Sequence, residues 1–207
     1  MENVLVSFIL AAVISLLVTP LVRKLAFKVG ALDIPKDNRR VHNKPMPLMG
    51  GLAIYTSFVI SALIFLPLNK ALISILVGGT IILISGIIDD IKELSPKGKI
   101  LFQIAAAVVL ILGDIKIDAV TNPFGYPGSV ILLDGFSIPL TIFWVVGITN
   151  TLNLIDGLDG LAAGVTTIAS LAFLCVAREF SYLSIMIVSA IIAGSCLGFL
   201  PYNFNPA

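Results

Sequence analysis

Long apolar runs are the feature that most constrains this chain of 207 residues. Several of them reach the roughly 18–20 residues that an α-helix needs to cross about 30 Å of hydrocarbon. Hydrophobic residues make up 58% of the sequence and charged residues 12%, against about 45–50% and about 25% in soluble domains. The sequence therefore predicts an all-α fold, a polytopic bundle of transmembrane helices, and argues against a water-soluble domain.

About seven segments are candidate spans, of which the fourth is short. We expect them near residues 4–22, 50–66, 71–88, 100–112, 139–154, 161–177 and 182–200. The first run has no basic segment before it, so we interpret it as a retained helix, with a signal peptide as the alternative. Residues 1–207 are interpreted as a single transmembrane catalytic domain.

The basic residues predict the orientation of these spans. They follow the first and third spans, as Arg23, Lys24, Lys28, Lys36, Arg39, Arg40 and Lys44, and then Lys92, Lys97 and Lys99. By the positive-inside rule, the N-terminus lies outside and the C-terminus in the cytoplasm. Four polar segments, residues 35–51, 89–99, 150–159 and 203–207, then share the cytoplasmic face. The outer segment 113–137 is expected to form turns and a short strand pair.

An acidic pair, Asp89 and Asp90, closes the third apolar run. Ionisable groups at the edge of a bilayer are costly, which makes them candidates for function. Two adjacent carboxylates can hold Mg²⁺, or one can bind a cation while the other accepts a proton. Alternatively, they cap the next turn and pair with Lys92. Lys99 begins the fourth run, where a lysine can meet a lipid phosphate, whereas Lys97 is better explained as positive-inside anchoring.

The densest polar cluster runs from Asn150 to Asp159, directly after an apolar span. It places Asn150, Asn153, Asp156 and Asp159 at intervals of three, with Gly157 and Gly160 between and after them. The glycines allow the backbone to turn, so the four side chains can line the mouth of a pocket. Such oxygen ligands suit Mg²⁺. A structural calcium loop is the alternative, but its ligand count does not match.

His42 is the only histidine, in the basic loop that contains Arg40. Arginines and lysines there can bind a nucleotide diphosphate, or simply mark the cytoplasmic side. No extended basic face is present, so nucleic acid is not an expected partner.

Taken in order, these motifs resemble the polyprenyl-phosphate N-acetylhexosamine-1-phosphate transferases (glycosyltransferase family 4). The resemblance covers nearly the whole chain. It rests on Asp33-x-Pro35, Arg40-x-His42, Pro47-x-x-Gly50-Gly51, Asp89-Asp90 with Lys99, the segment Asn150 to Gly160, and Pro201-Tyr-Asn-Phe-Asn-Pro-Ala.

The resemblance implies a multi-pass enzyme of the bacterial plasma membrane with its active site on the cytoplasmic face. Such enzymes transfer a sugar-1-phosphate from a UDP-N-acetylhexosamine to undecaprenyl phosphate and depend on Mg²⁺, with Mn²⁺ as a substitute. The branch that transfers N-acetylglucosamine-1-phosphate for teichoic acid or O-antigen is the most similar. The phospho-N-acetylmuramoyl-pentapeptide transferases are the alternative within the family, and a cation-coupled transporter is the alternative in another class. Membrane lipids are expected neighbours, and a homodimer is left open.

By the same resemblance, Asn153 is expected to be a Mg²⁺ ligand, and Asp89 and Asp90 either bind the metal or deprotonate and position the lipid phosphate. Lys99 and Asp156 are placed with the catalytic residues.

The remaining residues carried over from the family are expected to bind substrate. Asp159 matches the residue that recognises uracil, with Asn150, Arg40 and His42 also assigned to substrate binding. The family continues with further spans and a Gly-Asp-x-Gly-Ser motif that supplies a Mg²⁺ ligand, so these 207 residues alone are expected to be inactive.

Overall fold

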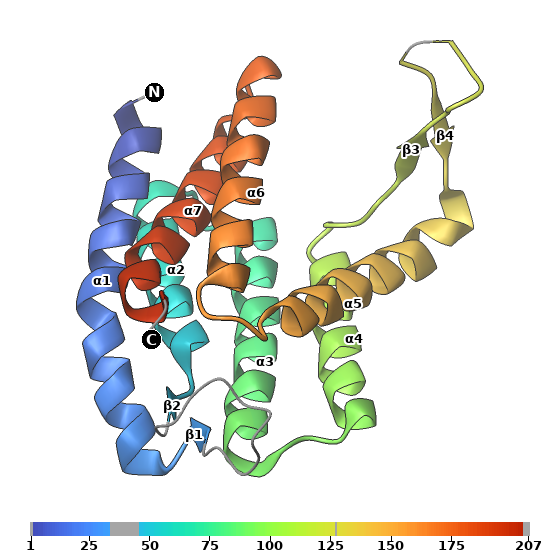
Figure 1. Ribbon diagram of the computed structural model, residues 1–207. Coiled ribbons are helices and arrows are strands. Elements are labelled where there is room, and N and C mark those ends of the chain that lie inside the picture. Colours follow the sequence, from blue (N-terminus) through green and yellow to red (C-terminus); the bar gives the residue numbers. More distant parts are fainter. Residues whose placement is uncertain (1, 34–45, 127, 205–207) are drawn as a thin grey trace. The chain divides into compact units, whose positions relative to one another are not determined.

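A computed structural model describes residues 2–33, 46–126 and 128–204. In order along the chain, as labelled in Figure 1, its elements are α1 (Glu2–Val29), β1 (Leu32–Asp33), β2 (Met46–Pro47), α2 (Gly50–Phe65), α3 (Lys70–Lys92), α4 (Pro96–Leu112), β3 (Ala119–Thr121), β4 (Val130–Leu132), the short 3₁₀ helix η1 (Asp134–Phe136), α5 (Ser137–Ile155), α6 (Leu161–Glu179) and α7 (Leu183–Asn203).

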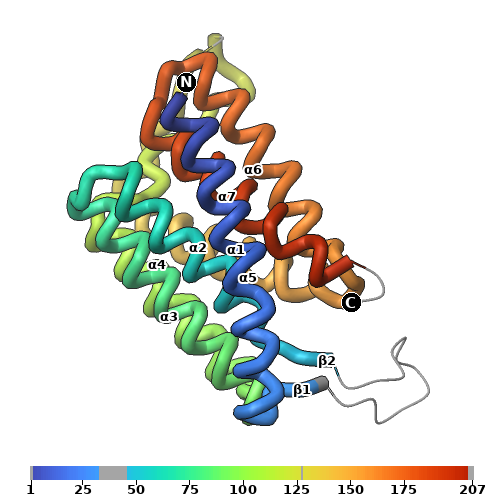
Figure 2. Tube along the Cα trace, turned by 90° about the vertical axis from the view of Figure 1, so that its left-hand side faces the viewer, coloured from blue at the N-terminus to red at the C-terminus, as the bar shows by residue number. Residues whose placement is uncertain are grey.

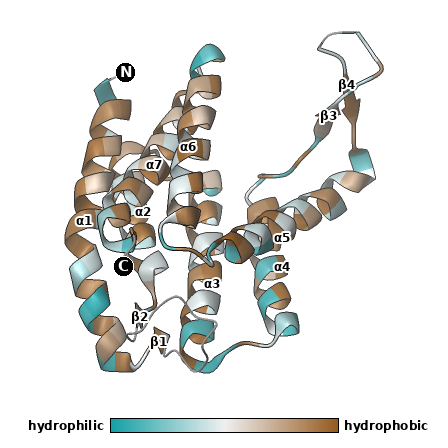
Figure 3. Cartoon of the chain, in the orientation of Figure 1, coloured by the Kyte–Doolittle hydropathy of each residue, from teal (hydrophilic) through white to brown (hydrophobic). Residues whose placement is uncertain are grey.

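The helices agree with the predicted all-α membrane fold. Five of them, in α1, α3, α5, α6 and α7, are long and apolar enough to cross a membrane, while α2 is a shorter apolar helix. Figure 3, coloured by the hydropathy of each residue, shows that hydrophobic residues (brown) predominate along these helices. The chain is therefore a multi-pass membrane protein, and its orientation in the membrane stays a prediction.

The helices α1, α3 and α4 extend furthest beyond their predicted spans. α1 continues to Val29 and includes Arg23, Lys24 and Lys28, where the sequence predicts the connection after the first span. A helix satisfies its own backbone hydrogen bonds, so it can continue into the aqueous layer, where its basic side chains are solvated. α4 begins at Pro96, where the Ser95 side chain accepts a hydrogen bond of 3.2 Å from the Gly98 amide. Serine at the cap and proline in the first turn are typical helix starts.

The chain forms two compact units. The first comprises residues 1–67, 83–94 and 153–207, and its centre is the packing of α1 against α7, with α2 and α6 alongside. Figures 1 and 2 both show α1 and α7 side by side. Small residues recur along the buried stripe of α1, which allows its neighbours to approach closely. These residues are Ser7, Ala11, Ser15, Thr19 and Ala26.

Two glycines on α7, Gly194 and Gly198, lie directly against the backbone of α1. A Cβ atom at Gly194 would overlap the carbonyl group of Phe8, and one at Gly198 would overlap that of Ala12. The spacing of four residues places both glycines on one face of the helix. This arrangement is the Gly-x-x-x-Gly packing that lets membrane helices touch through their backbones.

A buried serine pair joins three helices of the same unit. The Ser57 hydroxyl of α2 donates a hydrogen bond of 2.6 Å to the Ala11 carbonyl of α1, and its oxygen lies 3.0 Å from the Ser195 hydroxyl of α7. Since the Ser57 proton is committed to Ala11, Ser195 is the donor in the second bond. Both side chains are fully buried. Water cannot reach them in this apolar interior, so these two bonds satisfy hydroxyl groups that would otherwise be costly to bury.

The second unit comprises residues 68–82 and 95–152. Its segment between α4 and α5 contains the predicted strand pair, in which β3 and β4 are antiparallel with Val120 opposite Ile131. At the base of this hairpin, the Asp118 carboxylate accepts a hydrogen bond of 3.0 Å from the Ser137 hydroxyl and lies 3.0 Å from the Lys116 ammonium. Hydrogen bonds from Lys116 and then Ser137 lower the pKa of Asp118, because both stabilise its charged form.

Candidate active site

The acidic pair lies in the last turn of α3, and Asp90 joins this turn to the start of α2. The backbone amide of Met49 donates a hydrogen bond of 3.0 Å to Oδ2 of Asp90. Met49 precedes α2 with a φ of 72°, a left-handed conformation that costs a non-glycine residue roughly 1–2 kcal/mol. A charge-assisted hydrogen bond to a partly buried carboxylate offsets a cost of this size.

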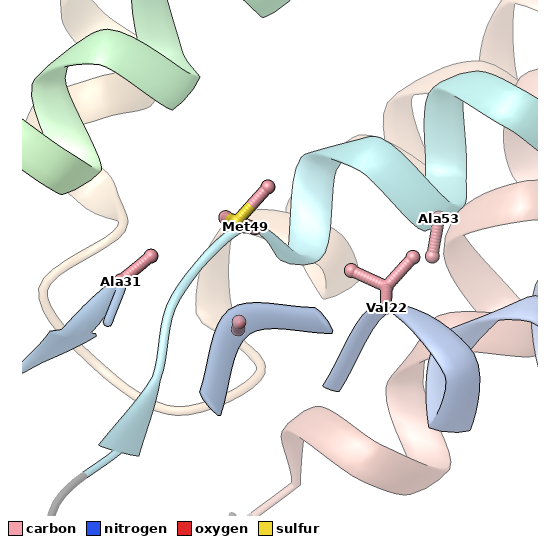
Figure 4. Packing of buried hydrophobic residues seen from close by; sticks show 5 residues of the cluster. Val22, Ala31, Met49 and Ala53 are labelled. Atoms are coloured by element: carbon pink, nitrogen blue, oxygen red, sulfur yellow. The ribbon is translucent and has the colours of Figure 1, made fainter. Parts of the chain in front are cut away.

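Apolar packing also holds Met49 in this conformation. Its side chain is buried in a cluster with residues of α1 and α2, and Figure 4 shows Val22, Ala31 and Ala53 around it. Just beyond Met49, a Cβ atom at Gly50 would overlap the ring of Phe199, whereas Gly51 has open space around it. A larger residue at Gly50, the first glycine of Pro47-x-x-Gly50-Gly51, would therefore require the Phe199 ring to move.

A pair of two-residue strands, β1 and β2, precedes Met49 and the start of α2. Leu32 pairs with Pro47 and Asp33 with Met46, and the Leu48 amide donates to the Ala31 carbonyl at 3.0 Å. The predicted substrate-binding residues Arg40 and His42 lie between these strands, outside the described residues. Their assignment stays a prediction.

Asp89 accepts a hydrogen bond of its own within the turn that ends α3. Its Oδ1 lies 2.9 Å from the Leu94 amide. A helix C-terminus carries partial negative charge, so carboxylates in the last turn are electrostatically unfavourable. Two of them in succession are therefore poorly explained by helix stability alone, although each has one oxygen bonded to a backbone amide.

Lys99 lies one turn before Gln103, on the same face of α4. The Lys99 side chain is half-buried and Lys97 is exposed, and the roles predicted for them stay predictions. Gln103 is 6% exposed and forms a two-way amide pair with Asn150 of α5. Asn150 Nδ2 donates to Gln103 Oε1 at 2.8 Å, and Gln103 Nε2 donates to Asn150 Oδ1 at 3.3 Å.

The end of α5 and the following turn contain the other polar candidates. Asn153 lies in the last turn of α5 and is exposed, and Asp156 and Asp159 lie in the turn that leads to α6. Partial desolvation raises the pKa of Asp156, because a less polar surrounding disfavours the carboxylate.

The turn ends at Gly160, which has a φ of 73°. Its amide donates a hydrogen bond of 3.1 Å to Oδ1 of Asn203 in α7. A Cβ atom at Gly160 would lie 3.5 Å from the Asn203 carbonyl and from Leu200, so the glycine is needed mainly for its conformation. Asn203 thus holds the end of the turn that contains Asp156 and Asp159.

Carboxylate and amide oxygens such as those of Asp89, Asp90 and Asn153 are the donors that Mg²⁺ prefers. In the described part of the chain, no group of three or more His, Cys, Asp or Glu side chains gathers around one point. Protein sites for Mg²⁺ usually contain one or two carboxylates and are completed by water and substrate phosphates. By the chemistry of their donor atoms, the residues present fit the ion.

The predicted residues are divided between the two units. Asp89, Asp90, Asn153, Asp156 and Asp159 belong to the first unit, and Lys99 and Asn150 to the second.

Sequence reasoning missed Gln103 and the contact of Asn203 with Gly160. The signal for Gln103 was its position as the only polar side chain in the run 100–112, where an amide needs a partner. No comparable signal marks the Asn203 contact, because it joins residues 43 positions apart.

Comparison with known proteins shows that this sequence is similar to membrane transferases along its whole length. The family model "Glycosyl transferase family 4" matches residues 72–207. The Bacillus subtilis (strain 168) protein named "Probable undecaprenyl-phosphate N-acetylglucosaminyl 1-phosphate transferase" is 40% identical, over 100% of this chain and 57% of the relative.

More distant relatives of both branches also match. The "Decaprenyl-phosphate N-acetylglucosaminephosphotransferase" of Mycobacterium tuberculosis (strain ATCC 25618 / H37Rv) is 36% identical over 95% of this chain and 53% of its own length. The "Phospho-N-acetylmuramoyl-pentapeptide-transferase" of Thermoanaerobacter sp. (strain X514) is 33% identical over 100% of this chain and 69% of its own length. The chain thus spans about half the length of the N-acetylglucosamine-type relatives.

Proposed function

This chain belongs to glycosyl transferase family 4, and from that premise we propose that the full-length protein transfers N-acetylglucosamine-1-phosphate from UDP-N-acetylglucosamine to undecaprenyl phosphate. The products are undecaprenyl-diphosphate N-acetylglucosamine and UMP. This reaction would begin the synthesis of a cell-wall or surface polysaccharide of the teichoic-acid or O-antigen type, at the cytoplasmic face of the membrane.

One observation carries the proposal: the match to the Bacillus subtilis relative extends over the whole chain at 40% identity. Every candidate site residue therefore lies within the aligned region. The position of the acidic pair in the last turn of α3, at the edge of an apolar span, also supports the proposal, because ionisable groups at such a place are costly and are candidates for function.

In the proposed reaction, an oxygen of the lipid phosphate attacks the β-phosphorus of the UDP-sugar and forms a new P–O bond. The bond between that phosphorus and the bridging oxygen breaks, and its electron pair leaves with UMP. Such a transfer depends on positioning and on neutralising phosphate charge more than on covalent help. We assign charge neutralisation to Lys99 and positioning or deprotonation of the lipid phosphate to the Asp89 and Asp90 pair, and we count Asp156 among the catalytic residues.

The remaining candidates are proposed to bind substrate and metal. Asp159 would recognise the uracil, and Arg40 and His42 the rest of the nucleotide sugar. Asn153, together with Asp89 and Asp90, would hold Mg²⁺, with Mn²⁺ as a substitute. The ion supplies Lewis-acid charge neutralisation to the diphosphate when it is bound. A homodimer stays a prediction.

The second candidate is the transfer of phospho-N-acetylmuramoyl-pentapeptide. It is favoured by relatives of that name at 32–34% identity, lower than the 40% of the N-acetylglucosamine relative. The chemistry at the phosphates would be the same, so donor choice decides between the two.

The test is transfer of radiolabel from UDP-N-acetylglucosamine to undecaprenyl phosphate by the purified full-length protein, with Mg²⁺ or with EDTA. We expect a Mg²⁺-dependent lipid-linked product and release of UMP. Product only from UDP-N-acetylmuramoyl-pentapeptide would establish the second candidate, and product from neither donor would contradict both.

Two variants make the test specific. Asp89→Asn keeps the size of the side chain and an acceptor for the Leu94 amide, while removing the charge. Asn153→Ala removes the proposed Mg²⁺ ligand. We expect about 100-fold lower turnover for Asp89→Asn and a higher Mg²⁺ requirement for Asn153→Ala. Wild-type turnover in both variants would separate these residues from the reaction.

A further inference from the structure

A partly buried amide pair joins α4 and α5 inside the second unit. Gln103 of α4 and Asn150 of α5 exchange two hydrogen bonds, at 2.8 and 3.3 Å. Asn150 Nδ2 also donates to the Val146 carbonyl at 2.9 Å. Both N–H groups of the Asn150 amide are therefore used within the protein, and neither is left to donate to a substrate.

We propose that Gln103 is a positioning residue and that the Gln103–Asn150 pair sets the place of Lys99. This inference rests on the proposed function, in which Lys99 neutralises a phosphate. The inference also changes the role expected for Asn150. Instead of contacting substrate, Asn150 would support the neighbouring helix α4.

The first reason is the cost of placing this pair where it lies. A buried amide without partners is unfavourable by about 1–3 kcal/mol, and an apolar pair of similar volume would avoid that risk in a membrane helix. Two reciprocal hydrogen bonds are strongly directional, since both form at only one rotation and one height of α4 relative to α5. The pair therefore specifies geometry that apolar packing leaves adjustable.

The second reason is the position of Lys99. It lies four residues before Gln103, on the same face of α4, and its side chain is half-buried. A rotation or shift of α4 would move Lys99 directly, because both side chains are attached to one rigid helix. Lys97 lies on a different face and is exposed, so it is not held in this way.

The experiment is a double-mutant cycle in the full-length protein, with Gln103→Leu, Lys99→Met and the two combined. If Gln103 acts through Lys99, Gln103→Leu lowers kcat/KM by about tenfold in the wild-type background. It has almost no further effect beside Lys99→Met. Equal losses in both backgrounds would overturn the proposal, because Gln103 would then act independently of Lys99.

A matched control and a swap separate positioning from stability. Thr141→Val removes a buried hydroxyl that bonds the Ile117 amide at 2.9 Å at the other end of α5, and we expect it to leave kcat/KM unchanged. The exchange Gln103→Asn with Asn150→Gln can restore the pair and should recover part of the activity lost in either single variant.

A second readout does not depend on activity. Lys99 and Lys97 are labelled with an amine-reactive reagent and compared by mass spectrometry within one protein. We expect Gln103→Leu to raise the ratio of Lys99 to Lys97 labelling several-fold, and Thr141→Val to leave it unchanged. A raised ratio in a protein without transferase activity would reject the proposed function and retain the positioning role, whereas an unchanged ratio would reject the positioning role.

Discussion

The Met49 amide and the Asp90 carboxylate are joined by a hydrogen bond of 3.0 Å, which ties the end of α3 to the start of α2. The bond links two sequence motifs that lie 41 residues apart. Asp90 thus has a structural role in addition to the catalytic role proposed for it, and substitutions can separate the two roles.

Asp90→Ala and Asp90→Asn should differ in stability. Alanine removes the acceptor of the Met49 amide, and we expect a loss of about 1–3 kcal/mol. Asparagine keeps an acceptor oxygen at the same place, so most of that stability should remain while the charge is lost. Thermal unfolding in detergent measures the first effect and transferase turnover the second. If both variants were equally unstable, the charge of Asp90, and not the acceptor oxygen alone, would stabilise the contact between the end of α3 and the start of α2.

The glycines of α7 should tolerate no added methyl group. Gly194→Ala or Gly198→Ala would push α7 away from the backbone of α1, at an expected cost of about 1–3 kcal/mol each. Gly164→Ala in α6 is the control, because a Cβ atom there meets nothing within 4 Å and alanine favours the helix. Chemical denaturation of the three variants tests this, and equal stability would show that α1 and α7 can separate without cost.

Two buried serines of α2 should respond differently to alanine. Ser57→Ala removes the bond to the Ala11 carbonyl and leaves Ser195 without its acceptor, so a loss of about 1–2 kcal/mol is expected. Ser61→Ala, one turn along the same helix, should be neutral or stabilising. Among the described residues, the Ser61 hydroxyl is buried and has no hydrogen-bond partner. The thermal unfolding midpoints of the two variants measure the difference. A larger loss of stability for Ser61→Ala than for Ser57→Ala would contradict the prediction.

Asn203 should affect the turn that contains Asp156 and Asp159. Asn203→Leu removes the acceptor of the Gly160 amide, and we expect about tenfold lower kcat/KM through misplacement of that turn. Asn203→Asp keeps an acceptor and should retain more activity. Hydrogen exchange of residues 156–160 provides an independent measure, and unchanged protection in Asn203→Leu would show that the bond does not hold the turn.

Asp156 should make the folded state slightly less stable at neutral pH than at acid pH. Its folded-state pKa lies above the ordinary value of 3.8, so the folded chain binds more protons than the unfolded chain between these two values. Stability therefore falls as the pH rises through this interval, and the loss is complete above the folded pKa. Asp156→Asn removes the carboxylate and with it this pH-dependent loss of stability. The substitution should therefore stabilise the protein at pH 7 but not below pH 3.8. Equal effects at both pH values would contradict the shift.

Much of the fold could be predicted from the sequence, because a membrane span is a local property. Length and hydropathy located the helices α1 to α7, and Gly and Pro marked the hairpin of β3 and β4. Asp89, Asp90 and the cluster from Asn150 to Asp159 were conspicuous for a similar reason, since polar groups beside apolar runs are costly and rarely accidental.

The contacts between these elements were decided only by the tertiary structure. Hydropathy does not show that the amide of an apolar residue, Met49, meets Asp90, or that Asn150 directs its amide to Gln103. Both depend on which helix faces become neighbours, and in a membrane that choice is made by close backbone approach at residues such as Gly194 and Gly198, and by buried hydrogen bonds. Sequence thus determined where the polar groups are, and packing determined what each of them bonds.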